Sequence, residues 1–589
     1  MTQKKKGIRI ASFLFALLVL FQTVEVSAAQ QTLPSGVNAN QLEEEIDSFV
    51  EEHEETTAGM AVAVFDTSDE LVKSYYGYVD KENQIPGDAE SVFEWGSTTK
   101  LLVWVSVMQL YEQGKLDLNE DIRTYLPEGF LTNLSYDTPV TMTNLMNHNA
   151  GFQEVYSDLF VKDLSGISGL EDVLKVHQPE QIYEPGTVAA YSNWGVALAA
   201  YVVENVSGMS FSDYVHQNIF EPLGMEHSAL YMDLSDNTWV QEKRQELQCY
   251  TTTGELIPEC FYYITMYPAG MCTSTLDDFE TFARALLDED CVLFEKTETR
   301  TEMFSPTAYF GDTDIPSNCH GFWMIPFGVQ TLGHGGNTAG CSSYLLLDQE
   351  DSIGVVVMTN QSGESIYNSE MMGLIFGTYD RSNYTADSEL PSGIYRPGRT
   401  VRKGPFKIMS MSYCTVEEDE AMLWMVDEID GLQKVVYSYG DYLEVPTAVM
   451  VLELGLVLLW LAAFLFSLIS LLVRLIAFIV RKIRKKEPAV NHLRKWSMVA
   501  ALLQIVSLIL LVAAIVCVSA YLRWNTYFWI FVVFGILAIA MIVMAVYGIV
   551  ENRGKQLKIR QKVYNVFTIV FMIVTVANIL YWNLFMFWM

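Results

Sequence analysis

The sequence lacks the short motifs that mark the commonest metal and nucleotide sites. His53 opens the segment HEETT, which has no second histidine to complete an HExxH zinc site, and the other histidines are scattered. No GxxxxGK loop is present to bind phosphates, no GxSxG elbow presents a serine, and no CxxC pair occurs. We therefore expect no metal and no cofactor, and a chemistry other than that of zincins, P-loop proteins or elbow-type hydrolases.

Basic side chains are scarce in the first three quarters of the chain. Residues 447–589 contain 14 Lys and Arg against 3 Asp and Glu, so the overall charge of −34 leaves −45 on residues 1–446. Nucleic acids and other polyanions bind to basic surfaces. The composition therefore argues against a nucleic-acid partner and predicts a solvated, acidic surface.

Long apolar runs are confined to the C-terminal quarter. Four runs are long enough to cross a bilayer: Thr447 to Val473, Ser497 to Leu522, Tyr527 to Val550 and Val563 to Met589. The segments RKIRKKEPAVNHLRK and ENRGKQLKIRQK between them are basic, which places both in the cytoplasm by the positive-inside rule. We expect a multi-pass protein of the cell membrane whose large N-terminal part is extracytoplasmic.

The N-terminus agrees with this orientation. Three lysines at positions 4–6 and Arg9 precede the apolar run Ile10 to Phe21 and the small residues of Val26 to Ala28. This layout predicts a signal peptide over residues 1–28, with an uncleaved anchor as the alternative. Of the eight cysteines, Cys517 lies in a membrane run, so at least one of the seven exported thiols is free or bonded elsewhere. A bridge between Cys249 and Cys260, around a turn-like stretch, stays open.

Strand and helix patterns outline an α/β domain over residues 32–380. The stretches AGMAVAVFD and LVKSYYGYVD form one β-rich pair near the start, and SSYLLLD and SIGVVVMTN form another near the end. Helical patterns such as LLVWVSVMQLYEQG and NWGVALAAYVVENVSG fill the region between them. We expect a sheet closed by N- and C-terminal strands, with flanking helices and a helical subdomain.

Two shorter parts separate this domain from the membrane. Residues 381–392 are polar and contain Pro391, which predicts a linker. Residues 393–446 contain the alternating pieces KIMSMSY, AMLWMVDE and KVVYSY, which predict a small β-rich juxtamembrane module. The four-helix transmembrane domain then occupies residues 447–589.

The segment FEWGSTTK, residues 93–100, places Lys100 three residues after Ser97. On a helix the two side chains share a face. A serine needs a nearby base to act as a nucleophile, and a buried lysine loses its proton more easily because desolvation disfavours the charged amine. The apolar helix that follows predicts burial, with its positive N-terminal end beside Ser97. One SxxK match arises about once or twice by chance in such a chain, so an unreactive pair is the alternative.

Two further segments hold polar groups at turn-like positions. Tyr191 and Asn193 lie two residues apart in PGTVAAYSNWG, before a helix, where both can point into one cleft. A core tyrosine and a helix-capping asparagine are the alternative. In TLGHGGNTAG, the glycines after His334 let the backbone approach a ligand and leave the Asn337 N–H to donate. A simple turn with a surface histidine is the alternative there.

Together and in this order, SxxK, YxN and HGG resemble the motifs of the serine β-lactamase and penicillin-binding-protein superfamily. The YxN motif is typical of the branch with class C β-lactamases, low-molecular-mass DD-peptidases and related esterases. Stretches such as KLDLNEDIRTYLPE, VTMTNLMNHNAGF and YPAGMCTSTLDDFETFARALL resemble the same family in the same order. The resemblance covers residues 43–379 and implies an antiparallel sheet, a helical subdomain and an active site between them.

The resemblance also implies roles for these residues. Ser97 would be the acylated nucleophile and Lys100 its hydrogen-bonded proton partner. Tyr191 would be a general base that later protonates the leaving group, while Asn193 would hold Lys100 and a substrate amide. The N–H groups of Ser97 and Asn337 would form the oxyanion hole. Three more residues of the third motif would bind substrate: His334, Gly335 and Gly336.

The third motif departs from the pattern of many relatives, in which a lysine and a threonine stand where His334 and Gly335 stand here. Loss of a permanent cation weakens recognition of a substrate carboxylate, which puts turnover of penicillins in doubt. An unperturbed histidine titrates near about pH 6.5. The acidic exterior would raise the pKa of His334 and burial would lower it, and the sequence leaves both open.

The sequence thus predicts a membrane-tethered extracytoplasmic serine hydrolase that acts on an amide or ester: a D-amino peptide, a β-lactam or a small ester. The alternative is a sensor that binds a ligand or β-lactam and signals through its transmembrane helices. A transporter ranks third, because apart from Glu453 and Arg474 the spans contain almost no charged residues. The expected partners are a small-molecule or peptide substrate outside the cell and the membrane.

Overall fold

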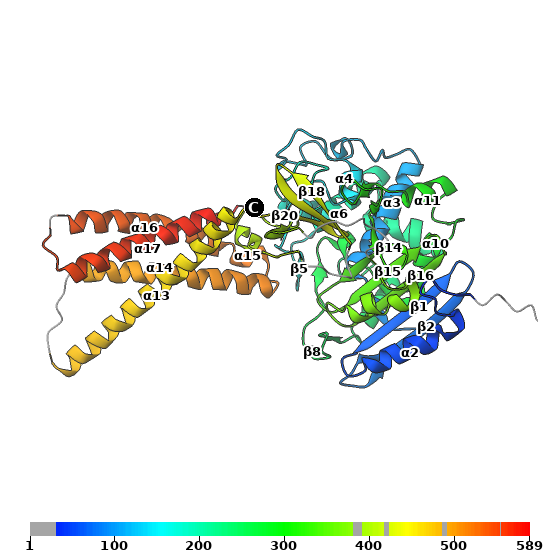
Figure 1. The fold of residues 1–589 in the computed structure, drawn as a ribbon, viewed down its shortest axis with the longest axis horizontal. Helices are drawn as coiled ribbons and strands as arrows, with labels where there is room; N and C mark the ends of the chain where they lie inside the picture. The colour runs from blue at the N-terminus through cyan, green and yellow to red at the C-terminus, as the bar shows by residue number, and fades with distance from the viewer. Residues whose placement is uncertain (1–30, 381–390, 417–422, 486–491, 554, 589) are drawn as a thin grey trace, which may run out of the picture.

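The computed structural model describes residues 31–380, 391–416, 423–485, 492–553 and 555–588. The predicted signal peptide and most of the predicted linker lie outside the described residues. The described chain forms a large α/β domain, a small β-sheet and a bundle of long helices that extends from one side of the domain (Figure 1).

A nine-stranded sheet is the centre of the α/β domain. All of its strand pairs are antiparallel, and β1 lies between β16 and β2, so strands from the two ends of the domain meet as predicted. The strands in spatial order are β11 (Ala308–Tyr309), β12 (Pro316–Cys319), β13 (Phe322–Pro326), β14 (Gln330–Asn337), β15 (Ser342–Asp348), β16 (Ile353–Thr359), β1 (Gly59–Asp66), β2 (Glu70–Asp80) and β3 (Ile85–Pro86).

The two faces of this sheet are covered by different helices. Along β1, Ala61 and Ala63 pack in the core that contains α10 (Leu276–Leu287), whereas Val62 and Val64 pack in the core that contains α2 (Leu42–Glu52). This alternation follows from the two-residue period of a strand. Both faces of β1 are therefore buried, which explains its nearly continuous apolar sequence.

A helical region packs on the α10 side of the sheet. Its helices are α3 (Lys100–Glu112), α4 (Met142–Met146), α5 (Leu170–Val176), α6 (Asn193–Ser207), α7 (Phe211–Val215), α8 (Glu221–Leu223), α9 (Thr238–Arg244) and α11 (Thr297–Met303). On the opposite side, beside α2, lies the short helix α12 (Gly373–Phe376). The first eleven residues of α3 and of α6 are buried, in accord with their apolar sequences.

Short sheets complete the α/β domain. They are β4 (Val92–Glu94), β10 (Thr273–Thr275) and β6 (Ser228–Ala229) in one sheet, β5 (Phe160–Val161) with β9 (Tyr263–Ile264), and β7 (Cys249–Tyr250) with β8 (Leu256–Ile257). A disulfide joins Cys249 to Cys260 across the last of these, which resolves the alternative left open by the sequence. The remaining described cysteines are unbridged: Cys272, Cys291, Cys319, Cys341, Cys414 and Cys517.

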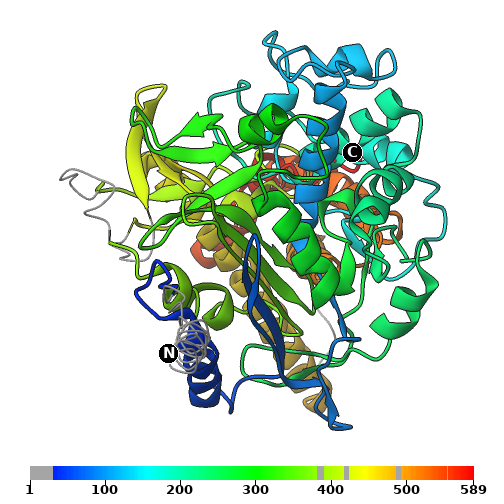
Figure 2. The ribbon, with the colours of Figure 1, turned by 90° about the vertical axis from the view of Figure 1, so that its right-hand side faces the viewer.

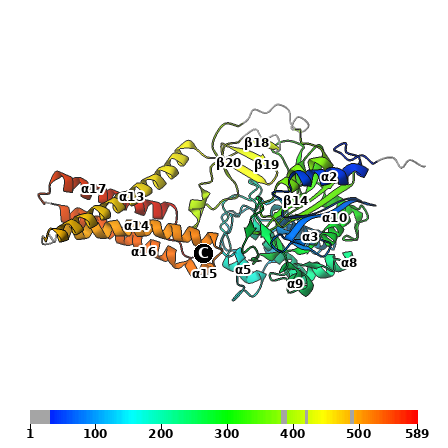
Figure 3. The same ribbon diagram turned by 90° about the horizontal axis from the view of Figure 1, so that it is seen from below.

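A four-stranded sheet lies on the side of the α/β domain from which the bundle extends (Figures 1 and 3), and Figure 2 shows its yellow strands at the edge of the domain. Its strands in spatial order are β17 (Tyr395–Pro397), β20 (Gly440–Glu444), β19 (Leu432–Tyr437) and β18 (Trp424–Ile429). We call residues 393–446 the juxtamembrane module. Met425 and Val436 of this module pack against Phe310 and Met324 of the large sheet, so the module is anchored on the α/β domain.

One predicted piece of the module is wrong. The segment KIMSMSY was expected to be a strand, but Lys407–Ser410 form a 3₁₀ helix. The ring of Phe406 lies 5.9 Å from that of Trp524 and 5.8 Å from that of Phe531, and Ile408 and Met411 pack in the same cluster. The apolar residues of this segment therefore pack on the bundle, where spacing by three suits a helix better than a strand.

The bundle contains four helices long and apolar enough to cross a membrane, as predicted. The helices of this region are α13 (Thr447–Ile483), α14 (His492–Ser519), α15 (Trp524–Tyr527), α16 (Trp529–Asn552) and α17 (Ile559–Tyr581). Near the start of α13, Glu453 accepts a hydrogen bond from Arg396 of β17 at 2.8 Å and from Tyr581 at 2.9 Å. The first turns of α13 and the end of α17 thus lie together beside the module.

The bundle also contacts the α/β domain directly. Arg523, between α14 and α15, forms an ion pair with the buried carboxylate of Asp158 at 3.3 Å, and the Trp524 N–H donates to the same carboxylate at 2.6 Å. The Arg523 guanidinium also donates to the carbonyl oxygens of Asp163 and Ser165. One end of the bundle is therefore tied to both the domain and the module.

Candidate active site

Ser97 lies in a 3₁₀ turn, η2 (Gly96–Thr99), directly before α3. Two neighbours hold the residue before Gly96 in place: the Trp95 N–H donates to the Cys272 carbonyl at 2.7 Å, and the Ser343 hydroxyl donates to the Trp95 carbonyl at 2.6 Å. These hydrogen bonds hold the chain just before the turn, and Ser97 lies at the N-terminal end of a buried helix, where negative charge is stabilised.

Lys100 is fully buried and points back at Ser97. Its Nζ donates to the Ser97 Oγ at 3.0 Å and to the carbonyl oxygen of Ala269 at 2.6 Å. Burial and, next, the positive charge of Arg399 lower the pKa of Lys100 well below its ordinary value, while Glu154 opposes the shift. The structure therefore favours the neutral amine, which can accept a proton from Ser97.

Tyr191 lies over the same lysine, with its ring centroid 4.9 Å from the Lys100 Nζ. Its hydroxyl is buried and makes no hydrogen bond of normal geometry with the described residues. The hydroxyl does lie close to Ser97, and this contact lowers the pKa of Tyr191. Burial nevertheless raises the pKa of Tyr191 above its ordinary value. The phenol is therefore protonated at neutral pH and can act as a proton donor.

Asn193 is the first residue of α6, two positions after Tyr191 as the motif requires, and it is almost fully buried. The structure differs from the expected pairing of Asn193 with Lys100, because no side-chain hydrogen bond of Asn193 is found in the described part of the chain. The Ala269 carbonyl bonds Lys100 instead. Ser192, and not Asn193, caps the helix by accepting from the Gly195 N–H at 3.0 Å.

The third motif lies in β14, whose backbone passes unusually close to η2. A Cβ added to Gly336 would lie 1.8 Å from the Trp95 carbonyl oxygen, and a Cβ added to Gly96 would lie 2.5 Å from the Asn337 nitrogen. Gly96 also has φ = +55°, which disfavours other residues. Glycines on both sides thus bring the Asn337 backbone next to the turn that contains Ser97, the arrangement that an oxyanion hole with this N–H requires.

His334 belongs to the interior of the site. It is 2% exposed, its Nδ1 lies 2.6 Å from the Gly335 carbonyl oxygen, and its ring centroid lies 6.0 Å from that of Tyr191. Burial, followed by the charge of Lys100, lowers the pKa of His334 to about 3. The sequence left open whether the acidic exterior would raise this pKa or burial would lower it. Burial has the larger effect, so the imidazole is uncharged at neutral pH.

Sequence analysis missed several residues of this site. The ring of His148 stacks on that of Tyr191 with centroids 4.4 Å apart, and its Nδ1 accepts from the Ser192 N–H at 3.1 Å. Tyr439 of the module lies 6.3 Å from His334, ring to ring. Arg399, also of the module, lies 5.0 Å from the Tyr191 ring centroid. His148 lies two residues after α4, in the stretch VTMTNLMNHNAGF that resembles the family. Nothing in the module's local pattern indicates that the module reaches the active site.

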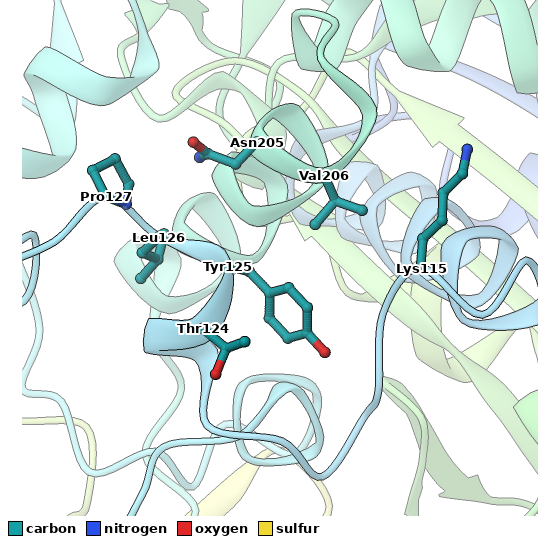
Figure 4. A pocket seen from close by; sticks show the side chains of 7 residues that line it. All are labelled: Lys115, Thr124, Tyr125, Leu126, Pro127, Asn205 and Val206. Atoms are coloured by element: carbon teal, nitrogen blue, oxygen red, sulfur yellow. The ribbon is translucent and has the colours of Figure 1, made fainter.

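A surface pocket of about 590 Å³ lies away from these residues (Figure 4). It is lined by Lys115, Thr124, Tyr125, Leu126, Pro127, Asn205 and Val206. None of the three motifs contributes to it, and it holds no nucleophile beside a base, so it is not the candidate active site. Among the described residues, no cluster of metal-ligating side chains is found.

Comparisons with known proteins agree with the motifs. A family model described as Beta-lactamase matches residues 43–370. Protein flp of Staphylococcus aureus (strain N315) is 21% identical over 332 residues, which are 56% of this chain and 65% of that protein. Penicillin-binding protein 4* of Bacillus subtilis (strain 168) is 24% identical over 342 residues, 54% of this chain and 73% of that protein. The match thus spans less than two thirds of Protein flp.

Among solved structures, the octameric penicillin-binding protein homologue from Pyrococcus abyssi aligns with a TM-score of 0.48 and 19% identity, over 69% of this chain and 100% of the other. The D-amino acid amidase from Ochrobactrum anthropi SV3 aligns with a TM-score of 0.47 and 23% identity, over 57% of this chain and 97% of the other. The family model covers more than half of the chain and includes all three motifs. On this match, the chain belongs to the beta-lactamase family.

Proposed function

We propose that the α/β domain is a serine hydrolase that cleaves an amide or ester through an acyl-enzyme on Ser97. The observation that carries the proposal is the 3.0 Å contact between the Ser97 hydroxyl and a buried Lys100 amine whose pKa is lowered. A nucleophile within hydrogen-bond reach of a neutral base is what acyl transfer requires. The family membership supports the same chemistry.

In the first half of the reaction, the Ser97 Oγ bonds to the substrate carbonyl carbon and its proton passes to the Lys100 Nζ. The resulting oxyanion is stabilised by the N–H groups of Ser97 and Asn337 and by the positive end of α3. The bond to the leaving nitrogen or oxygen then breaks as the Tyr191 hydroxyl donates its proton, and Lys100 returns its proton to Tyr191. Water releases the acyl group by the same steps in reverse.

The division of roles between Lys100 and Tyr191 follows from their opposite pKa shifts. Burial disfavours the charged form of both groups, so it favours a neutral amine that accepts a proton and a neutral phenol that donates one. We therefore assign the first proton acceptance to Lys100 and the protonation of the leaving group to Tyr191. This refines the role of general base that the resemblance implied for Tyr191.

We further propose that the hydrolase acts outside the cell, on a D-amino peptide, a β-lactam or a small ester. The four apolar helices tether it to the membrane, and the ends of α13 and α16, which the basic segments follow in sequence, lie at the end of the bundle away from the α/β domain (Figure 1). The proposed parts are a signal peptide (1–28), the hydrolase domain (32–380), a linker (381–392), the module (393–446) and the transmembrane domain (447–589).

The test uses the full-length protein in detergent. A reporter penicillin, D-amino peptides and small esters are each incubated with it, and acylation and product release are followed by mass spectrometry. We expect a covalent adduct that Ser97→Ala abolishes and that Ser106→Ala retains. Ser106 is a matched control, because it is a buried serine of α3 whose hydroxyl donates to the Leu102 carbonyl at 2.7 Å, within its own helix. Labelling of Ser97→Ala at the wild-type level would exclude Ser97 as the nucleophile.

A sensor is the second candidate, because the module connects the active site to the bundle through Arg399 and Phe406. The two functions differ in one observable. A hydrolase releases product at a rate comparable with acylation, whereas a sensor keeps the acyl group and releases almost none. The same mass measurements over time distinguish them.

A further inference from the structure

Arg399 enters the active site from outside the part of the chain that matches the family. It follows β17 in the juxtamembrane module, and its guanidinium carbon lies 5.0 Å from the centroid of the Tyr191 ring. The Nζ of Lys100 lies 4.9 Å from the same centroid. A cation from the module is therefore a close neighbour of the groups that would move the proton.

The Arg399 guanidinium is hydrogen-bonded through Nε, whereas its two terminal nitrogens have no hydrogen-bond partner in the described part of the chain. Its Nε donates to the Glu154 carboxylate, whose side chain is 1% exposed, and the adjacent Thr400 carbonyl accepts from the Glu154 N–H at 3.1 Å. Within the described part of the chain, Nη1 and Nη2 make no hydrogen bond. The side chain is 44% exposed, so these donors remain available to a ligand.

The other basic groups of the site do not provide a permanent charge. The Lys100 amine is shifted towards its neutral form, and the pKa of His334 is about 3. Burial opposes the charge of Arg399, but the charge and hydrogen bond of Glu154, together with Tyr191 and Tyr156, outweigh it and raise the pKa of Arg399 above its ordinary value. Of the three, Arg399 is thus the one that is charged at every physiological pH.

The module is fixed against the site at a second place. The Ala189 N–H donates to the Asp441 carboxylate at 2.9 Å, and the Asp441 N–H donates to the Ala189 carbonyl at 2.8 Å. At the turn between β19 and β20, the Tyr439 hydroxyl lies 3.0 Å from that of Tyr344. The module therefore holds the chain just before Tyr191 and lies beside the third motif, so Arg399 is positioned by several independent contacts.

We propose that Arg399 binds a carboxylate of the substrate and thereby makes the juxtamembrane module part of the active site. A guanidinium presents two parallel N–H donors that match the two oxygens of a carboxylate. The inference rests on the proposed hydrolase function, and it names the substrate class: acyl donors that carry a carboxylate near the scissile bond. Arg399 thus takes the place of the cation that the third motif lacks.

The test compares two thioesters that differ in one group. S-(N-benzoylglycyl)thioglycolate has a free carboxylate on its leaving group, and its methyl ester has none. Thiol release is measured with full-length protein in detergent, at a pH on the plateau of the activity profile, for the wild type, Arg399→Ala, Arg399→Lys and Lys403→Ala. Lys403 is the matched control: it belongs to the same segment, but pairs with Glu180 at 3.1 Å and both side chains are largely exposed.

We expect Arg399→Ala to lower kcat/KM for the carboxylate about tenfold to a hundredfold more than that for the methyl ester, mainly through KM. A smaller loss shared by both thioesters is expected as well, because the Arg399 charge helps to lower the pKa of Lys100. Arg399→Lys should restore part of the preference because it keeps the charge, and Lys403→Ala should leave both values unchanged. Equal losses on both thioesters would mean that Arg399 only positions Tyr191, and no loss on either would mean that it does not contact substrate. Each of these results overturns the inference.

Failure of the proposed function gives a different result. In that case the wild type cleaves neither thioester and Ser97 carries no adduct, and the role of Arg399 falls with it. If the wild type cleaves both thioesters and the variants do not change their ratio, the hydrolase stands and only the role of Arg399 is refuted. Thermal unfolding of each variant identifies a folding defect, and Arg399→Lys keeps the test decisive if Arg399→Ala does not fold.

Discussion

Replacing Gly336 by alanine tests whether the close approach of β14 to the nucleophile is required for acylation. The added methyl carbon would lie 1.8 Å from the Trp95 carbonyl oxygen, 2.7 Å from the Ser343 Oγ and 2.9 Å from the Thr98 Oγ1. Ordinary carbon–oxygen contacts begin at about 3.3 Å, so β14 and η2 must separate by roughly 1.5 Å. The backbone carbonyl cannot rotate away, because Trp95 is hydrogen-bonded on both sides.

This displacement should separate the Asn337 N–H from the carbonyl that Ser97 attacks. A misplacement of about 1 Å can cost a hundredfold in rate, so we expect acylation of Ser97 to slow by about a hundredfold or more. Overpacking should also lower the free energy of unfolding by about 1–3 kcal/mol. The rate is measured from the appearance of the adduct by mass spectrometry, and the stability from thermal unfolding of the same samples.

Gly373→Ala is the matched control for this change. It adds the same methyl group to α12, where the nearest atom would be the Thr378 Cγ2 at 3.9 Å. We expect no loss of acylation there. Gly96→Ala should behave like Gly336→Ala, because its Cβ would lie 2.5 Å from the Asn337 nitrogen and its φ is positive. Acylation of Gly336→Ala within about threefold of the wild-type rate would refute the argument that this close approach builds the oxyanion site.

Further predictions concern the proton-transfer groups, His334 and the topology. Lys100→Ala and Tyr191→Phe should each slow acylation by about a hundredfold or more, measured with the same probe. The pKa of His334 is about 3 in the folded protein, and so lies below the unfolded value of about 6.5. Stability should therefore fall by about 4 kcal/mol as pH drops from about 6.5 to 3, and His334→Gln, which cannot take up this proton, should lose less in denaturant titrations. The same neutral histidine should leave the preference for a carboxylate flat between about pH 5 and pH 8; a decline with rising pH that His334→Lys removes would contradict this. Cysteine labelling in intact cells should place residue 490 inside, and labelling from outside would reverse the proposed topology.

The proposed role of Arg399 changes how the chain is divided. The family match ends at residue 370, yet Arg399 and Tyr439 lie beside its catalytic motifs. The module that carries them also packs on the bundle through Phe406 and bonds Glu453 of α13 through Arg396. Contacts of a single small module therefore connect the bundle with Tyr191.

Several features could be predicted from the sequence because they depend on residues close together along the chain. Ser97 and Lys100 meet because they are three positions apart on a helical turn, and the buried strands show as runs of apolar residues. The membrane helices follow from the length and hydropathy of their own segments. The order of the three motifs indicated the family before any distance was known, and the family model confirmed it.

Other features were decided only by tertiary structure, because they join residues far apart in sequence. The Ala269 carbonyl that bonds Lys100, and Arg399 beside Tyr191, come from segments whose local patterns carry no sign of the site. His334 is neutral because other strands and the module bury it. The residues next to it in sequence do not determine how deeply it is buried. The segment after Phe406 became a 3₁₀ helix and not a strand because it packs on the bundle. Local pattern indicates most of the helices and strands and the candidate reactive residues, whereas the surroundings that set the charge of these residues exist only once the chain has folded.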